Sequence, residues 1–212
     1  MLDKRFLRDV PLPEDLSGEA ILSALQETQD FFKLIREQTG IILSDIIQAN
    51  NFSGVVSNVF TKKLDEVSLY KSYHDQRYPD LKHIDKHIGL EVKASNKAMK
   101  GGEGHNGHSG WHIVVCFDIL DNGDIEFIQV EIAELIGFEY GEASDWKYQG
   151  SSRNENDSQR TETYITTKVG TAKLRDGTVY LNLDRVQISP RLKKEREKVF
   201  ELDIPYFSPF SK

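Results

Sequence analysis

One run of apolar residues constrains the fold of this chain more than any other part of its sequence. Residues 111–117 read Trp-His-Ile-Val-Val-Cys-Phe and are apolar almost without interruption. Such a run is typical of a central β-strand covered on both faces, and we expect this strand at about 111–120. The sequence Asp-Asn-Gly-Asp at 121–124 predicts a hairpin turn into another strand at about 125–134. The chain is therefore expected to build its core around a covered sheet.

Helices that could cover this sheet are predicted mainly in the first third of the chain. Ser17 is suited to cap a helix at about 18–38, in which apolar residues recur on one face. A short buried helix is expected at 41–48. Ser53 is expected to cap a third helix, which reaches about residue 67.

The last third adds strands and one more helix. Residues 163–169 and 178–183 resemble strands, with Gly170 and the sequence Arg-Asp-Gly as turn signals between them. A basic helix is expected at about 190–200, and the aromatic tail 205–212 is expected to dock on the body or on a partner. The predicted fold class is α/β (α+β), with a central mixed β-sheet flanked by helices and an N-terminal helical part.

Three charged residues around a further strand, at about 88–95, point to a catalytic centre. Glu91 and Lys93 share a face of this strand because side chains alternate. The ten residues between Asp80 and Glu91 suit a hairpin, which would bring the second carboxylate beside the first. Paired carboxylates suit Mg²⁺, and a neighbouring lysine can act on a water or neutralise charge on a phosphate. The stretch therefore predicts hydrolysis of a phosphodiester.

The order Pro79-Asp80 … Glu91-Val92-Lys93 resembles the motif of the PD-(D/E)xK nuclease superfamily, and most of all its type II restriction endonucleases. The resemblance covers roughly residues 52–135, including a helix ahead of the motif. It implies a restriction-endonuclease-like core and a Mg²⁺-dependent enzyme that cuts double-stranded DNA at a short specific sequence.

The resemblance also implies roles for individual residues. Asp80, Glu91 and Lys93 would be catalytic, and Asp80, Glu91 and the Val92 carbonyl would bind the metal ion. Many members carry a further glutamate on the preceding helix, where this chain offers only Ser57 or Asn58. The number of bound metal ions, one or two, therefore stays open.

Two segments are candidates for contacts with DNA. The glycine-rich loop 96–110 leaves the Glu-Val-Lys strand directly, and we expect its lysines to hold phosphates. The segment 153–175 carries planar donors suited to base edges. The candidate DNA-binding residues are Lys97, Lys100, His105, Asn106, His108, Arg153, Asn154, Arg160, Lys173 and Arg175.

This assignment suggests how the chain is divided. At 212 residues it is expected to form a single domain, 1–212. Within it, 1–70 is mainly helical, 71–135 is the catalytic core, and 136–212 is a β-rich DNA-recognition part with a C-terminal tail. A homodimer is expected, because a two-fold dimer most simply cuts both strands of a palindromic duplex.

Charge and cysteine content bound the alternatives. The net charge of −7 argues against a protein that coats nucleic acid, although 168–198 holds nine Lys and Arg against four Asp and Glu. The single cysteine, Cys116, is expected to be buried and suits a reducing cytoplasm. No apolar run is long enough to cross a bilayer, and the first residues lack the core of a signal peptide, so we expect a cytoplasmic protein.

Other chemistries have weaker signals. His105, His108 and His112 invite a zinc interpretation, but they lie among glycines and at the start of a strand. No P-loop, nucleophile elbow or dinucleotide fingerprint is present in the sequence. Two alternatives to a restriction enzyme stay open: a structure-specific nuclease of repair or recombination, and a non-catalytic DNA-binding protein of the same fold.

Overall fold

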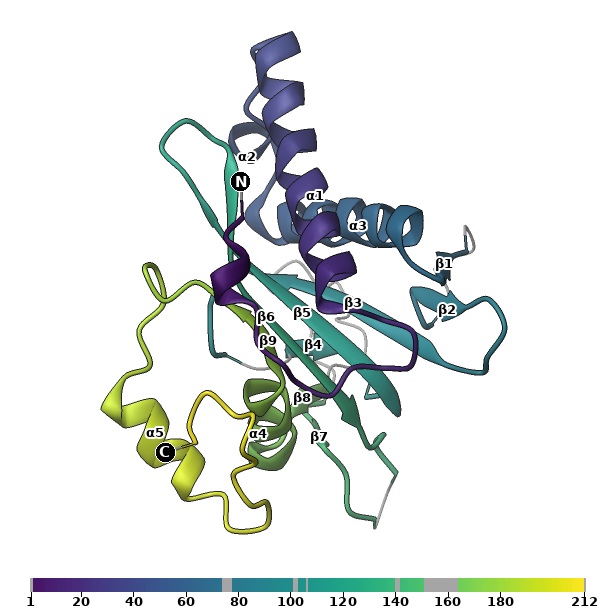
Figure 1. Ribbon diagram of the computed structural model, residues 1–212, viewed down its shortest axis with the longest axis vertical. Coiled ribbons are helices and arrows are strands. Elements are labelled where there is room, and N and C mark those ends of the chain that lie inside the picture. The colour runs from purple at the N-terminus through teal and green to yellow at the C-terminus, as the bar shows by residue number, and fades with distance from the viewer. Residues whose placement is uncertain are drawn as a thin grey trace.

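A six-stranded sheet forms the centre of the computed structural model, which describes residues 2–73, 78–100, 103–105, 107–139, 142–150 and 164–211 (Figure 1). At 50 and 103–105 it describes the backbone alone. In spatial order the strands are β1 (Tyr70–Ser72), β2 (Leu81–His83), β3 (Gly89–Ser95), β5 (Gly110–Ile119), β6 (Ile125–Leu135) and β9 (Thr178–Leu181). β3 and β5 are parallel and the other neighbours are antiparallel, so the predicted mixed sheet is confirmed.

Two long helices cover one face of this sheet. α1 (Gly18–Thr39) begins at Ser17, whose hydroxyl accepts a hydrogen bond from the Ala20 N–H at 3.1 Å, as the sequence predicted. It ends at Gly40, which has a φ of 71° and closes the last turn. α3 (Ala49–Val67) packs beside it (Figure 1). A short 3₁₀ helix, η1 (Lys4–Phe6), lies in the N-terminal arm.

Two predictions about this helical part are wrong. α3 begins four residues before the expected cap at Ser53 and has no side-chain cap. Its start is decided by packing, because residues four apart along it are buried against α1 and the sheet: Phe52, Val56, Phe60 and Leu64. The segment 41–48 forms only α2 (Leu43–Ile46), which has no buried residue, and Ile46 is 69% exposed.

The opposite face carries a three-stranded sheet in the order β4 (Glu103–His105), β8 (Tyr164–Thr166), β7 (Trp146–Tyr148), together with α4 (Lys168–Asp176). The strand predicted at 163–169 gives way to α4 after Thr166, so Gly170 lies inside a helix and not in a turn. A Cβ on Gly170 would lie 2.4 Å from the Asp145 carbonyl oxygen. This glycine therefore permits a close helix approach, and the last third is less rich in strands than expected.

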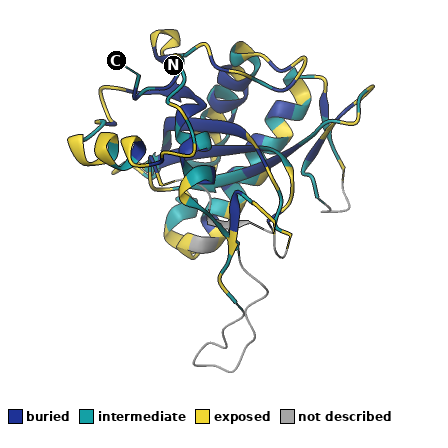
Figure 2. Ribbon diagram, turned by 90° about the horizontal axis from the view of Figure 1, so that it is seen from below, coloured by how far each residue is buried: buried dark blue, intermediate teal, exposed yellow. Residues whose placement is uncertain are grey.

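The sheet separates two apolar cores. Its central strands are largely buried (Figure 2). On β5, Ile113, Val115 and Phe117 belong to the core under α1 and α3, whereas Val114 and Cys116 belong to the core under α4. The expectation of a central strand covered on both faces, with a buried Cys116, is confirmed. None of the described helices is long and apolar enough to cross a membrane.

The C-terminal tail docks through a buried ion pair. Arg196 in α5 (Pro190–Glu197) lies 2.8 Å from the Asp176 carboxylate, and both side chains are almost completely buried. Arg196 also donates to the carbonyls of Leu202 and Asp203. Phe210 is 1% exposed. Of the two alternatives expected for the tail, the structure shows docking on the body.

Candidate active site

Asp80, Glu91 and Lys93 come together at one place on the sheet. β2 pairs antiparallel with β3, with Leu81 opposite Leu90, so Asp80 reaches the middle of β3. Its Oδ2 accepts a hydrogen bond from the Val92 N–H at 2.8 Å. The Lys93 Nζ lies 2.6 Å from the Glu91 Oε1. The predicted convergence of two carboxylates and an ammonium is therefore present in the structure.

Burial makes this cluster electrostatically demanding. Glu91 is 6% exposed, and its buried Oε2 has no hydrogen-bond partner among the described residues. Burial, and next the negative charge of Glu91, raise the pKa of Asp80 above its usual range. Two neighbouring carboxylates with an unsatisfied oxygen are a site that a divalent cation would stabilise.

The backbone adds a third oxygen to this donor set. In a strand, the N–H and C=O of one residue point to the same side. Because the Val92 N–H meets Asp80, the Val92 carbonyl lies on the Asp80 side of β3. The donors Asp80, Glu91 and Val92 fit Mg²⁺, which needs few protein ligands and keeps several waters. Within the described residues no three His, Cys, Asp or Glu side chains form a group that could hold a metal ion.

Pro79 fixes the position of Asp80 by packing on Gly89 in β3. A Cβ on Gly89 would lie 2.3 Å from the Pro79 Cγ and 3.0 Å from its Cβ. Only glycine leaves room for the proline ring at this point, so the two halves of the motif depend on each other. This contact was not predicted from the sequence, although a glycine at a strand start is a known signal for close approach.

An aromatic group borders the site on the β5 side. The Tyr78 hydroxyl donates to the Ser109 carbonyl, and its ring lies 4.2 Å from the His108 ring. His112 stands opposite Glu91 in the parallel pair of β3 and β5 and is 1% exposed. Burial lowers the pKa of His112 to about 4, so this imidazole is neutral at pH 7. Its Nδ1 lies 2.9 Å from the Gly110 carbonyl oxygen and acts as the donor.

The segment that follows β3 is fastened at Met99. The Met99 N–H donates to the Gln129 Oε1, and its carbonyl accepts from the Arg175 Nε, each at 2.7 Å. Met99 is buried and has a φ of 59°, a conformation that side chains rarely adopt. These two bonds hold the strained residue in place. Arg175, predicted to contact DNA, therefore lies mostly buried and positions the segment that carries Lys97 and Lys100.

The other predicted DNA-binding residues are distributed unevenly. Lys97, Lys100 and His108 are exposed close in sequence to β3 or β5. Lys173 is 2.6 Å from the buried carboxylate of Asp145, so its charge is already paired. Asn106, Arg153, Asn154, Arg160 and the side chain of His105 lie outside the described residues.

A second buried carboxylate, Glu131, lies two strands from Lys93 on the same face. In the strand register Lys93 stands beside Val114, and Val114 beside Glu131. Glu131 accepts one hydrogen bond from the Gln129 Nε2 at 2.9 Å, and its Oε2 has no partner in the described part of the chain. Burial raises the pKa of Glu131 to about 7.

This carboxylate should make stability depend on pH. Because the pKa of Glu131 is raised in the folded state, its contribution to the stability of the fold is fully present below the unfolded-state pKa. That contribution is lost as pH rises through 7. We expect Glu131→Gln to stabilise the fold by up to about 3 kcal/mol at pH 8.5, with little gain at pH 5. Urea unfolding at both pH values measures this difference. An equal effect at both pH values would contradict the raised pKa.

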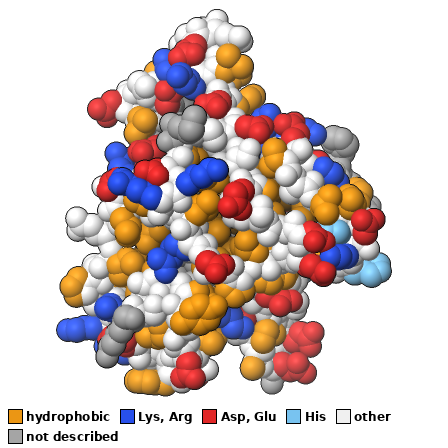
Figure 3. Space-filling model, viewed as in Figure 1, with side chains coloured by type: hydrophobic (Ala, Val, Ile, Leu, Met, Phe, Trp, Pro, Cys, Tyr) orange, Lys and Arg blue, Asp and Glu red, His pale blue; other side chains and the backbone are white. Residues whose placement is uncertain are grey.

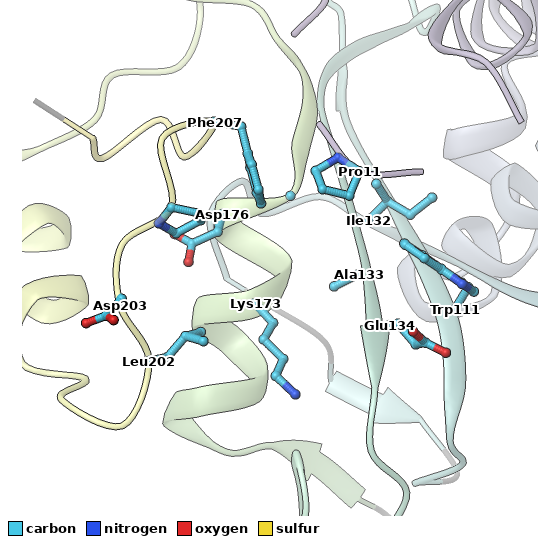
Figure 4. A pocket seen from close by; sticks show the side chains of 12 residues that line it. Pro11, Trp111, Ile132, Ala133, Glu134, Lys173, Asp176, Leu202, Asp203 and Phe207 are labelled. Carbon is cyan, nitrogen blue, oxygen red and sulfur yellow. The ribbon is translucent and has the colours of Figure 1, made fainter. Parts of the chain in front are cut away.

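A pocket of about 270 Å³ lies elsewhere, between β6, α4 and the C-terminal tail (Figure 4). Its walls include Pro11, Trp111, Ile132 and Phe207 and are mainly apolar. Neither Asp80, Glu91 nor Lys93 lines it. The candidate site on the sheet surface around β3 is therefore separate from this pocket.

In comparisons with known proteins, the chain matches no family model, no curated protein and no solved structure.

Proposed function

We propose that this chain is a Mg²⁺-dependent type II restriction endonuclease with a restriction-endonuclease-like core. The observation that carries the proposal is the convergence of Asp80, Glu91 and Lys93, with a buried Glu91 oxygen left unsatisfied. The arrangement of two carboxylates and a lysine around a hairpin supports phosphodiester hydrolysis.

Each residue has a distinct task in this proposal. Asp80, Glu91 and the Val92 carbonyl hold Mg²⁺, which when bound neutralises charge on the scissile phosphate. Lys93, one-third exposed and tethered to Glu91, reaches the space where a phosphate and an attacking water would lie. Its ammonium orients the water and stabilises developing negative charge.

Recognition and assembly complete the proposal. Lys97 and Lys100 contact the DNA backbone, and Arg153, Asn154 and Arg160 contact base edges. A two-fold homodimer in the cytoplasm cuts both strands. The exposed aromatic residues Phe200 (86%) and Tyr206 (87%) make the tail region a suitable contact surface.

A digest of several defined plasmids with Mg²⁺ tests the function. Discrete fragments that recur at the same positions support a restriction enzyme. Smears, or cutting at junctions only, favour a structure-specific nuclease of repair or recombination. Binding without any cutting favours a non-catalytic DNA-binding protein. The Glu91→Ala protein, purified in parallel, controls for contaminating nucleases.

The contact between Pro79 and Gly89 gives a further prediction. Gly89→Ala is expected to push Pro79 away from β3 and displace Asp80, lowering the cleavage rate about a hundredfold. Single-turnover cleavage and a thermal melt measure this effect. Gly54→Ala is the matched control, because an added Cβ there meets nothing within 4 Å and Gly54 lies in an exposed part of α3. Unchanged cleavage by Gly89→Ala would show that the proline turn does not position the site.

A further inference from the structure

The hairpin between β2 and β3 forms a groove beside the candidate site. It has a volume of about 470 Å³ and extends from Pro79 to the hairpin tip. Its lining includes Tyr73, Pro79, Lys82, His87 and Gly89. Pro79 directly precedes Asp80, so one end of the groove touches the turn that carries the proposed metal ligand.

The strand register places Lys82 on the catalytic face. Lys82 stands opposite Gly89, and Gly89, Glu91 and Lys93 share a face because side chains alternate along β3. Lys82 therefore lies one strand away from β3 and two residues short of Glu91. Two residues of strand correspond to about 7 Å, which a lysine side chain can span.

Lys82 is an exposed lysine on β2. Its Nζ lies 5.3 Å from the centre of the Tyr73 ring, and no carboxylate of the described residues forms an ion pair with it. The neighbouring Lys86 differs, because it pairs with Glu14 at 2.6 Å and also with Asp15. His87 is exposed at the tip, near the acidic Asp85. Figure 3 shows histidine, basic and acidic side chains together at the end of the molecule formed by β1 and β2.

The hairpin that holds Lys82 is firmly anchored. The His83 side chain is 1% exposed, its Nε2 lies 3.1 Å from the Asp15 carboxylate, and its Nδ1 accepts from the Asp85 N–H. The His83 ring also packs edge-on against Tyr70. Lys82 is thus presented from a rigid element, which reduces the entropy lost when it binds.

We infer that this groove binds the phosphate backbone of the DNA, with Lys82 as its main phosphate contact. The groove lies at the start of β3, whereas Lys97 and Lys100 follow its end. The inference rests on the proposed function. The DNA backbone then runs along β3, with Lys82 before the candidate site and Lys97 and Lys100 after it. Lys82 is a binding residue that supplies affinity and register, and it takes no part in the chemical step.

Binding of a fluorescently labelled random duplex, measured by anisotropy in metal-free buffer at two salt concentrations, tests this assignment. Lys82→Ala should weaken binding about tenfold at the lower salt concentration and reduce the salt dependence by about one unit of slope. Lys82→Arg should keep most of the affinity. Lys62→Ala is the matched control. Lys62 lies on α3, its side chain is 60% exposed, and its Nζ makes one long contact, 4.0 Å, with the Asp65 carboxylate.

The outcomes separate this inference from the proposed function. If Lys82→Ala binds like Lys62→Ala while the wild type binds and cuts DNA, the groove assignment is overturned and the nuclease proposal stands. If the wild type binds DNA without cutting it and Lys82→Ala is weakened, the groove stands and the catalytic proposal fails. A wild-type protein that does not bind the duplex overturns both.

Discussion

Glu91→Ala is expected to abolish cleavage of DNA while leaving the fold intact. Glu91 supplies a buried carboxylate with an unsatisfied oxygen and is the ion-pair partner of Lys93 at 2.6 Å. Without it the metal site keeps one carboxylate, and the several kcal/mol that a bound metal contributes are lost. The cleavage rate should therefore fall by at least about 10³-fold. Asp80→Asn should behave similarly, because it keeps an acceptor for the Val92 N–H and loses the charge.

DNA binding should survive both changes, because removing a carboxylate reduces repulsion of the phosphate. Mg²⁺ titration by calorimetry should show the loss of metal binding directly, and a thermal melt should show that the fold is kept. Glu134→Ala is a suitable control, since Glu134 is an exposed carboxylate on β6, away from Asp80. If Glu91→Ala cuts DNA at a near wild-type rate, the site lies elsewhere.

The candidate site residues could be predicted because their geometry is local. Glu91 and Lys93 share a face of one strand, and the short hairpin from Asp80 leaves little freedom in where the second carboxylate lies. The central strand was equally predictable, because a continuous run of apolar residues is typical of a strand covered on both faces. Ser17 marked the start of α1 because its cap is a contact between neighbours in sequence.

Features that depend on distant contacts were missed. Gly170 is typical of a turn in sequence, and its place in α4 follows from the approach of the Asp145 backbone, 25 residues earlier. The start of α3 is set by packing against α1 and not by a capping side chain. Arg175 resembles a base-reading residue in sequence, yet it donates to the carbonyl of Met99. Such roles require the tertiary fold, because nothing near these residues in sequence encodes their partners.

The same division applies to the candidate site. The positions of its three charged residues follow from one strand and one hairpin. The packing of Pro79 on Gly89 and the burial of Glu131 depend on how the elements pack in the tertiary fold. Lys82 lies between these cases. Side-chain alternation gives its face once its register opposite Gly89 is known, but that register comes from the pairing of β2 with β3.

Lys93→Ala is expected to slow the chemical step by about 10² to 10⁴-fold, because it removes the group placed to orient the water and stabilise charge on the phosphate. Lys93 is the one ammonium within 4 Å of Glu91 in the described residues, at 2.6 Å. Its loss leaves Glu91 with no ammonium partner among the described residues. Single-turnover cleavage at saturating DNA and Mg²⁺ separates this effect from binding.

The pattern of effects matters more than the size of the loss. Lys93→Ala should lower the single-turnover rate and change DNA affinity only slightly, whereas Lys82→Ala should do the reverse. Because both substitutions remove one positive charge from the same face of the sheet, a general effect of net charge predicts equal results for the two. Lys93→Arg keeps the positive charge but changes the shape of the charged group, so it should bind DNA like the wild type and recover only part of the cleavage rate. If Lys93→Ala retains a tenth or more of the wild-type single-turnover rate, Lys93 acts only as the counter-ion of Glu91, and the group that orients the water must be sought elsewhere.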